Sequence, residues 1–224
     1  MTTEPVAVSP RVERGYELTR LQAEVWASQR LYPEAPVANM ATAHRISGPI
    51  DPQRFVEAFD RTVRACDVLR TVIRGDASQP GDRAVVLAAP PQTTAVIDLA
   101  AEALPAWFEQ RISRPLDATV CCYDSVLIRH ADDDWTWWLD LHHLVTDGAS
   151  QALVHGFVAR AYDGEQIDAL SYAALADEQH AGAVDHDHRP AADADVPLQP
   201  FGSRGPSTTA TIRSSVPIDG VDQA

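Results

Sequence analysis

The length, composition and charge of the chain exclude several classes of protein. The 224 residues carry 18 Lys and Arg against 32 Asp and Glu, which gives a net charge of −14, and 45% of the residues are hydrophobic. Such a chain can bury a sizeable core as one large or two small domains. The excess of acidic residues argues against a nucleic-acid binder or a protein that docks on anionic lipid, because both need a basic surface. The sequence has no long uninterrupted apolar run, so no membrane span is expected.

The N-terminus and the cysteines favour a cytoplasmic protein. Residues 1–15 lack the basic stretch followed by an apolar stretch that marks a secretory signal, and we expect them to form a flexible lead-in. The cysteines are Cys66, Cys121 and Cys122, an odd number with two adjacent members. This pattern suits neither a disulfide framework nor a zinc site, so we expect small buried hydrophobic residues.

Hydrophobic periodicity predicts alternating helices and strands from residue 18 onward. In chain order we expect a helix at 18–31, a strand at 39–48, a helix at 51–68, strands at 69–75 and 83–88, a helix at 100–113, strands at 122–131 and 135–143, and helices at 148–164 and 171–182. Thr19 can cap the first helix, and Asp51 followed by Pro52 is typical of a helix start. Residues 90–100 have no assigned structure. The fold class is α/β, a mixed β-sheet with helices on one face.

The composition changes after residue 182. Residues 183–208 are rich in Asp, His, Pro, Gly and Ser, which predicts an exposed loop or linker. The Asp-His-Asp-His run at 185–188 lies in this segment and is not expected to form a specific metal site. Residues 209–218 return to a strand-like pattern. A strand at the end of the chain needs a partner strand.

The strongest chemical signal lies between the strand at 135–143 and the helix at 148–164. His142 and His143 end the strand, and Asp147 and Gly148 follow just before the helix. Because adjacent side chains on a strand point to opposite faces, one histidine should face the core and hold the loop, and the other should face a cleft. An imidazole suits proton removal from an amine or alcohol near neutral pH. Gly148 is expected to allow a sharp turn. The alternative is a buried core histidine and an Asp147 that only caps the helix.

The spacing His142-His143-x-x-x-Asp147-Gly148 is the HHxxxDG signature, and with it the chain resembles the chloramphenicol-acetyltransferase-like acyltransferases, in particular the condensation domains of nonribosomal peptide synthetases. Further family motifs match in order: L-T-x-x-Q-x-x-x-W at 18–26, G-P-I-D at 48–51, L-R-T at 69–71 and S-Y-A at 171–173. The family usually carries Arg-His before L-R-T, where this chain has Ala65-Cys66. That departure, together with the start at Met1, favours a starter domain that accepts a fatty acyl group.

The resemblance implies a chloramphenicol-acetyltransferase-like lobe with a mixed β-sheet covered by helices. It implies amide formation, in which an acyl thioester on a donor carrier protein is attacked by the amine of an aminoacyl group on an acceptor carrier. Phosphopantetheine arrives on these partners, and no bound cofactor or metal is needed. His143 would be a general base or would position the amine.

The other site residues would support this reaction. His142 and Asp147 would be mainly structural, and Asp147 would pair with an arginine, either Arg70 or one from another lobe. Gly148 and the backbone after it could offer N–H groups to the oxyanion.

The length suggests a truncated chain, because the family has two similar lobes with the active site between them. The resemblance therefore implies that 16–182 is the N-terminal lobe and that 209–224 is the start of the second lobe. We therefore expect the chain alone to be inactive or nearly so, and the remaining synthetase modules to be its partners in making a natural product such as a lipopeptide antibiotic. Two alternatives remain open. One is a stand-alone acyltransferase that forms esters, and the other is a non-catalytic lobe that only docks a carrier protein.

Overall fold

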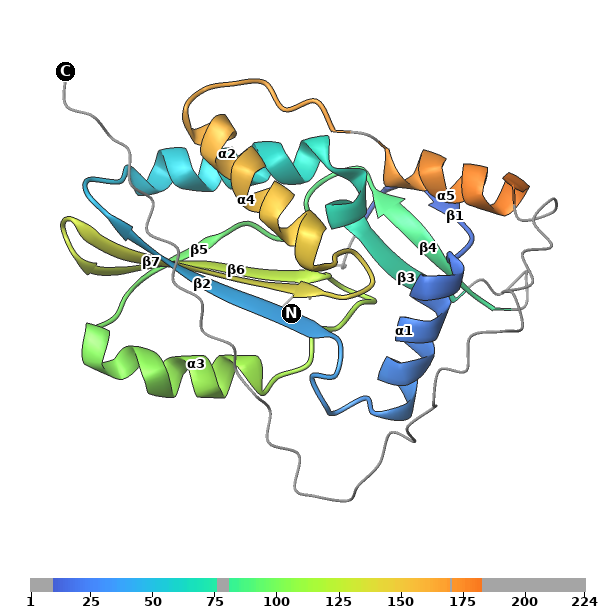
Figure 1. The fold of residues 1–224 in the computed structure, drawn as a ribbon, viewed down its shortest axis with the longest axis horizontal. Helices are drawn as coiled ribbons and strands as arrows, with labels where there is room; N and C mark the ends of the chain where they lie inside the picture. The colour runs from blue at the N-terminus through green and yellow to red at the C-terminus, as the bar shows by residue number, and fades with distance from the viewer. Residues whose placement is uncertain (1–9, 76–80, 170, 183–224) are drawn as a thin grey trace, which may run out of the picture.

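The computed structural model describes residues 10–75, 81–169 and 171–182, which form two neighbouring β-sheets and the helices around them (Figure 1). The strands are β1 (Val12–Tyr16), β2 (Asn39–Ser47), β3 (Thr71–Gly75), β4 (Asp82–Leu87), β5 (Ala95–Asp98), β6 (Tyr123–Ala131) and β7 (Asp134–His142). The α-helices are α1 (Arg20–Leu31), α2 (Pro52–Ala65), α3 (Leu104–Ile112), α4 (Gly148–Tyr162) and α5 (Tyr172–Gly182). Short 3-10 helices lie at η1 (Asp67–Arg70) and η2 (Ala101–Ala103).

The expected mixed sheet is present, but it does not contain every strand. Its order is β2-β7-β6-β5, with β5 and β6 parallel and the other neighbours antiparallel. The remaining strands form a separate antiparallel sheet in the order β1-β4-β3. The two sheets share one large core, in which Tyr16 and Ile73 of the smaller sheet join the apolar residues of β6 and β7.

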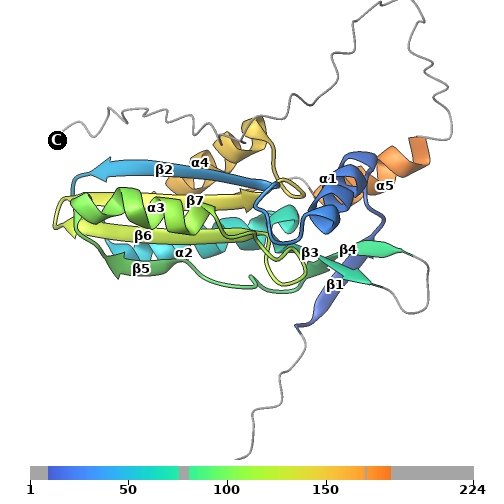
Figure 2. The same cartoon turned by 90° about the horizontal axis from the view of Figure 1, so that it is seen from below.

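Helices cover both faces of the four-stranded sheet, so the expectation of helices on one face is wrong. Trp137 and Trp138 are neighbours on β7 and therefore point to opposite faces. The ring of Trp137 lies 5.2 Å from that of Phe55 on α2, whereas Trp138 stacks at 5.2 Å on Phe108 of α3. The view in Figure 2, turned by 90° from Figure 1, places α3 on the opposite side of the sheet from α2 and α4.

Two edge strands were not expected. Val12–Tyr16 forms β1, so a flexible lead-in over residues 1–15 is wrong for this part of it, and Ala95–Asp98 forms β5. Most side chains of both strands are exposed, which leaves little hydrophobic alternation in their sequences. Their order comes from hydrogen bonding to β4 and β6, which are distant in sequence.

Local signals placed the starts of two helices correctly. The Thr19 side chain accepts the Gln22 N–H at 3.3 Å in a capping box at the start of α1. Asp51 accepts the Gln53 N–H at 2.9 Å at the start of α2, with Pro52 in the first position. The expected linker at 183–208, the histidine run at 185–188 and the strand at 209–218 lie outside the described residues.

The cysteines are buried and free, as expected from the sequence. Burial raises the pKa of the Cys66 thiol to about 11 and that of Cys121 to about 12, and it raises the pKa of Cys122 as well. These thiols therefore stay protonated at neutral pH, which suits core residues rather than nucleophiles.

Candidate functional site

The site is built where β7 ends and α4 begins. β7 runs through the core to His142, which is completely buried, and a short turn then leads to Gly148. The His142 Nδ1 accepts the N–H of Leu144 at 3.1 Å, and the His142 N–H donates to the Cys122 carbonyl at 2.8 Å. Burial lowers the pKa of His142 to about 4, so its imidazole is neutral at neutral pH. The prediction that one histidine faces the core and holds the loop is confirmed.

The other histidine, His143, is held by its backbone and not by its ring. Its N–H donates to the carbonyl of Ala38 at 2.7 Å, just before β2. Its side chain is half-buried, and its Nδ1 has no hydrogen-bond partner among the residues that the structure describes. The backbone of His143 is therefore fixed, whereas no hydrogen bond from Nδ1 fixes its ring.

Asp147 caps α4 and has a different partner from the one expected. Its carboxylate accepts the Ser150 N–H at 2.7 Å, and the Ser150 hydroxyl in turn accepts the Asp147 N–H at 2.8 Å. The hydrogen bonds from Ser150 hold the pKa of Asp147 below its ordinary value. The carboxylate is exposed, and it forms no ion pair with a described arginine.

The predicted ion pair between Asp147 and Arg70 is therefore wrong. Arg70 is buried and forms an ion pair with Glu13 on β1 at 2.6 Å, and it also donates to the carbonyls of Leu87 and Val63. The sequence could not show this arrangement, because the partner lies on the strand that the pattern failed to predict. An arginine from outside the described residues stays a prediction for Asp147.

Gly148 is neither strained nor crowded. Its φ is not positive, and a Cβ at this position would meet nothing within 4 Å. The change of direction occurs earlier, at residues 143–145, where the Val145 N–H donates to the His142 carbonyl, and the backbone of Asp147 is extended. In the expected oxyanion site after Gly148, the Ser150 N–H already binds the Asp147 carboxylate and is not open to an oxyanion, while the role of the other N–H groups there stays a prediction. A developing negative charge there would meet a carboxylate that already occupies the positive end of the helix.

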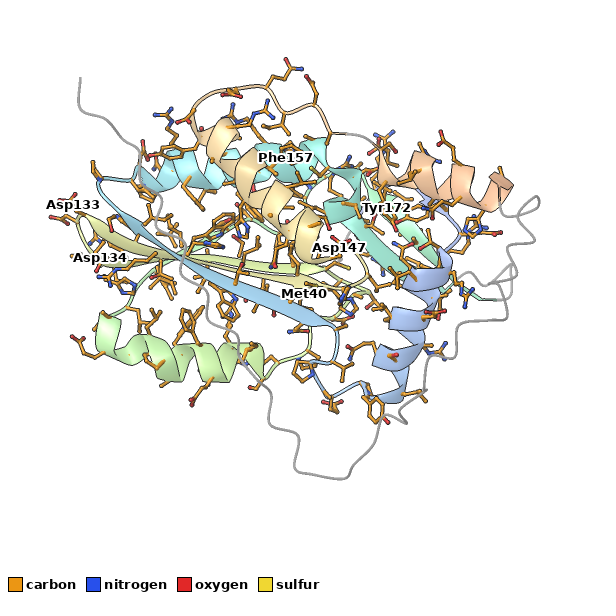
Figure 3. The ribbon with its side chains drawn as sticks, viewed as in Figure 1. Met40, Asp133, Asp134, Asp147, Phe157 and Tyr172 are labelled. Carbon is orange, nitrogen blue, oxygen red and sulfur yellow. The ribbon has the colours of Figure 1, made fainter. Side chains whose placement is uncertain are left out.

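Sequence reasoning missed two residues beside the turn. Gln22 of α1 is buried, and its Nε2 donates to the Leu144 carbonyl at 3.0 Å and to the Tyr16 hydroxyl at 3.2 Å. The only signal for Gln22 is its place in the L-T-x-x-Q-x-x-x-W pattern. The Tyr16 ring meets Tyr172 edge-on at 6.2 Å, so the S-Y-A segment also reaches this region. In the view of Figure 3, Asp147 lies between Met40 on β2 and Tyr172 on α5.

A second pair of histidines lies between β2 and α4. The rings of His44 and His155 are 4.1 Å apart and packed edge-on, and the His155 Nε2 lies 3.3 Å from the Thr42 hydroxyl. Burial lowers the pKa of His44 and lowers that of His155 to about 4. Both imidazoles are therefore neutral at neutral pH, and the site predicted from the sequence does not include them.

The described residues offer neither a cluster of metal ligands nor a membrane-spanning helix. In this part of the chain no three or more His, Cys, Asp or Glu side chains are grouped so as to hold a metal ion. Within the same ranges no helix combines the length and the apolar character needed to cross a membrane.

The sequence of the chain is similar to a protein family and to known synthases. The family model described as the condensation domain matches residues 12–184. The isonitrile lipopeptide synthase of Streptomyces coeruleorubidus is 28% identical over 212 residues, which cover 89% of this chain and 14% of that protein.

Solved structures give a similar picture. The starter condensation domain of rhizomide synthetase RzmA superimposes with a TM-score of 0.70 at 27% identity, covering 77% of this chain and 45% of that chain. A mutant of that domain, solved in complex with C8-CoA, matches with a TM-score of 0.69. This chain therefore spans less than half the length of the solved domain that it matches. Because the family model covers more than half of the chain, the chain belongs to the condensation domain family.

Proposed function

We propose that the chain supplies the histidine-bearing half of an acyltransferase that forms an amide bond in nonribosomal peptide synthesis. The observation that carries this proposal is His143, whose backbone is fixed by Ala38 and whose half-buried imidazole has a buried Nδ1 without a partner among the described residues. The HHxxxDG segment stands at this junction in a chain that belongs to the condensation domain family.

The proposed donor is a fatty acyl thioester, and the proposed acceptor is an aminoacyl group on a carrier protein. Support for a fatty acyl donor comes from the similarity to a starter condensation domain that was solved, as a mutant, with C8-CoA, and from the similarity to a lipopeptide synthase. Donor and acceptor would both bring phosphopantetheine to the site, since CoA and loaded carrier proteins carry the same arm. The chain itself then needs to bind no further organic group.

In the proposed reaction the acceptor amine attacks the thioester carbonyl. A C–N bond forms, the C–S bond breaks, and the proton lost by the amine ends on the departing thiolate. The imidazole of His143 would accept the amine proton or would hold the amine in line by a hydrogen bond. His142, being buried and neutral, would support the turn and would not take part in proton transfer.

The test compares histidine variants in the full-length protein that contains these residues. C8-CoA or a C8-loaded carrier is mixed with an aminoacyl-loaded acceptor carrier, and the intact mass of the acceptor is recorded. We expect the wild type to add the C8 acyl mass and His143→Ala to lose the product by roughly 100-fold or more, as is usual for a positioned acid–base group. His180→Ala removes a histidine from α5 and serves as the matched control, with unchanged product.

Two outcomes would contradict the proposal. Product formation by His143→Ala at the wild-type rate would exclude His143 from the reaction. If the wild type gives no mass shift with any donor but still binds both carriers, the result would favour the alternative that the lobe only docks carrier proteins.

A further inference from the structure

We infer that Gln22 of α1 is a positioning residue for His143, acting through the carbonyl of Leu144. The inference rests on the proposed function, because it concerns the imidazole that would act there. Gln22 is 2% exposed and lies 122 positions from Leu144 in sequence, yet its Nε2 donates to that carbonyl at 3.0 Å.

Both ends of the Gln22 amide are occupied, so its orientation is fixed. The Oε1 accepts the Thr19 N–H at 3.2 Å within the capping box of α1, which places the NH2 group on the opposite side. The second N–H of that group donates to the Tyr16 hydroxyl at 3.2 Å. Burial raises the pKa of Tyr16 to about 12, so the phenol stays neutral and can accept this bond.

The bond to Leu144 closes a short turn around His143. Within the turn, the Leu144 N–H donates to the His142 Nδ1 at 3.1 Å, and the Val145 N–H donates to the His142 carbonyl at 2.9 Å. The His143 N–H is held by Ala38 at 2.7 Å. The Leu144 carbonyl and the Val145 N–H belong to one peptide group, the second after His143, and Gln22 is the partner of its carbonyl. The peptides before and after His143 are thus held by Ala38 and by the His142 ring, and Gln22 fixes the following peptide, which closes the turn.

Fixing the peptide that closes the turn limits movement of the turn as a whole, and hence of the His143 Cα and the direction of its side chain. A misplacement of about 1 Å at a reacting group can cost roughly 100-fold in rate. Gln22 touches no reacting atom in this arrangement. Its effect should appear in the rate of the chemical step and not in the binding of the donor.

The first experiment uses matched glutamines of α1 in the full-length protein. Gln22→Met keeps the volume and removes both donors, and Gln29→Met does the same at a second buried glutamine, whose Nε2 donates to the carbonyls of Tyr32 and Ala35 at 3.1 Å. We expect kcat to fall roughly 10- to 100-fold in Gln22→Met with KM for the acyl donor unchanged. We expect Gln29→Met to lose stability and to keep kcat. Equal losses of kcat in both variants, matching their losses of stability, would show that Gln22 is merely structural and would overturn the inference.

A second variant of Gln22 tests the hydrogen bond donated to Leu144 alone. Gln22→Glu keeps the shape and the acceptor for Thr19, and a buried carboxyl has a raised pKa. When protonated it can still donate to Leu144, and when ionised it cannot. Relative to the wild type at each pH, its kcat should therefore fall as pH rises. A constant ratio of variant to wild-type kcat across the pH range would contradict the role of the donated hydrogen bond.

Amide hydrogen exchange separates this inference from the proposed function. Loss of the Gln22 bond should raise exchange at Leu144 and Val145 by roughly tenfold, which corresponds to one ordinary hydrogen bond. Unchanged exchange there in Gln22→Met would overturn the inference whatever the enzyme does. Full activity of His143→Ala would instead overturn the proposed function and would leave the exchange result to decide the role of Gln22.

Discussion

Among single residues, Asp147 shows how a charged group of the site can serve the fold. Its carboxylate accepts from both the backbone and the hydroxyl of Ser150, which satisfies groups that α4 would otherwise leave open. An exposed cap of this kind contributes about 1 kcal/mol. We expect Asp147→Ala to lower the free energy of unfolding by about that amount, and Asp147→Asn, which keeps an acceptor, to lose much less. Urea unfolding of the three proteins at neutral pH measures the difference.

The same cap predicts a dependence on pH. The pKa of Asp147 is lowered in the folded protein, so its stabilisation is complete above the ordinary Asp pKa and is lost as pH falls through the lower, folded value. The gap between the wild type and Asp147→Ala should therefore close in acid. An unchanged gap at low pH, or equal stability of the two proteins at neutral pH, would contradict a capping role.

Among the elements, β7 carries two buried groups whose effects on stability oppose each other. Asp140 is 2% exposed, and its Oδ2 accepts from the Asn39 amide at 2.7 Å. Burial raises its pKa from 3.8 to about 7, whereas burial lowers the pKa of His142 from 6.5 to about 4. As pH falls between these values, Asp140 takes up its proton preferentially in the folded state and stabilises it. The unfolded state alone protonates His142, which destabilises the fold.

Asp140→Asn should remove the stabilisation that protonation of Asp140 gives as pH falls. It should leave the destabilisation that comes from His142. We expect the variant to be more stable than the wild type near pH 8, where the wild type carries a buried carboxylate, and to lose stability more steeply between about pH 7 and pH 4. The size is about 1.4 kcal/mol for each unit by which folded and unfolded pKa values differ, so a few kcal/mol in total. Urea unfolding across this range gives the two curves, and parallel curves would contradict the assignment to Asp140.

The helix α5 is held by a carboxylate from a distant element. Asp67 in η1 accepts the Ser171 hydroxyl at 2.6 Å, the Tyr172 N–H at 2.8 Å and the Ala173 N–H at 3.2 Å. Asp67→Ala removes every one of these acceptors, at a cost of about 1 kcal/mol or more. We expect hydrogen exchange to rise several-fold at the amides of α5 while β6 and β7 stay protected. A uniform rise in exchange throughout the described residues would show global destabilisation and not release of α5. The exchange of α5 in Asp67→Asn should lie between that of the wild type and that of Asp67→Ala.

For the molecule as a whole, the sequence predicted what is encoded locally. The caps at Thr19 and Asp51 and the burial of His142 depend on neighbouring residues, so they could be predicted from spacing alone. β1, β5 and the ion pair of Arg70 depend on pairing between distant segments, which periodicity does not record. The contact of Gln22 could not be predicted either, because its partner Leu144 is brought close only by the packed fold.

The chain matches less than half of a solved condensation domain, and this has a consequence for its activity alone. The match to the solved starter condensation domain covers 77% of this chain and 45% of that chain. An apolar surface lies open between α1 and β2, where Leu31, Tyr32 and Val37 are 74%, 62% and 52% exposed. This surface adjoins Ala38, the backbone partner of His143. An imidazole beside an open apolar surface meets water, which weakens electrostatic interactions and competes for the thioester.

We therefore expect residues 1–224 alone to fold and to give no acylated acceptor above the uncatalysed background in the mass assay. The same residues joined to the remainder of a condensation domain should restore product and should reduce labelling of Tyr32 by a surface reagent. Transfer by the 224 residues alone at the rate of the longer protein would show that one half suffices. Restored activity with Tyr32 still fully labelled would show that the added half covers a different face.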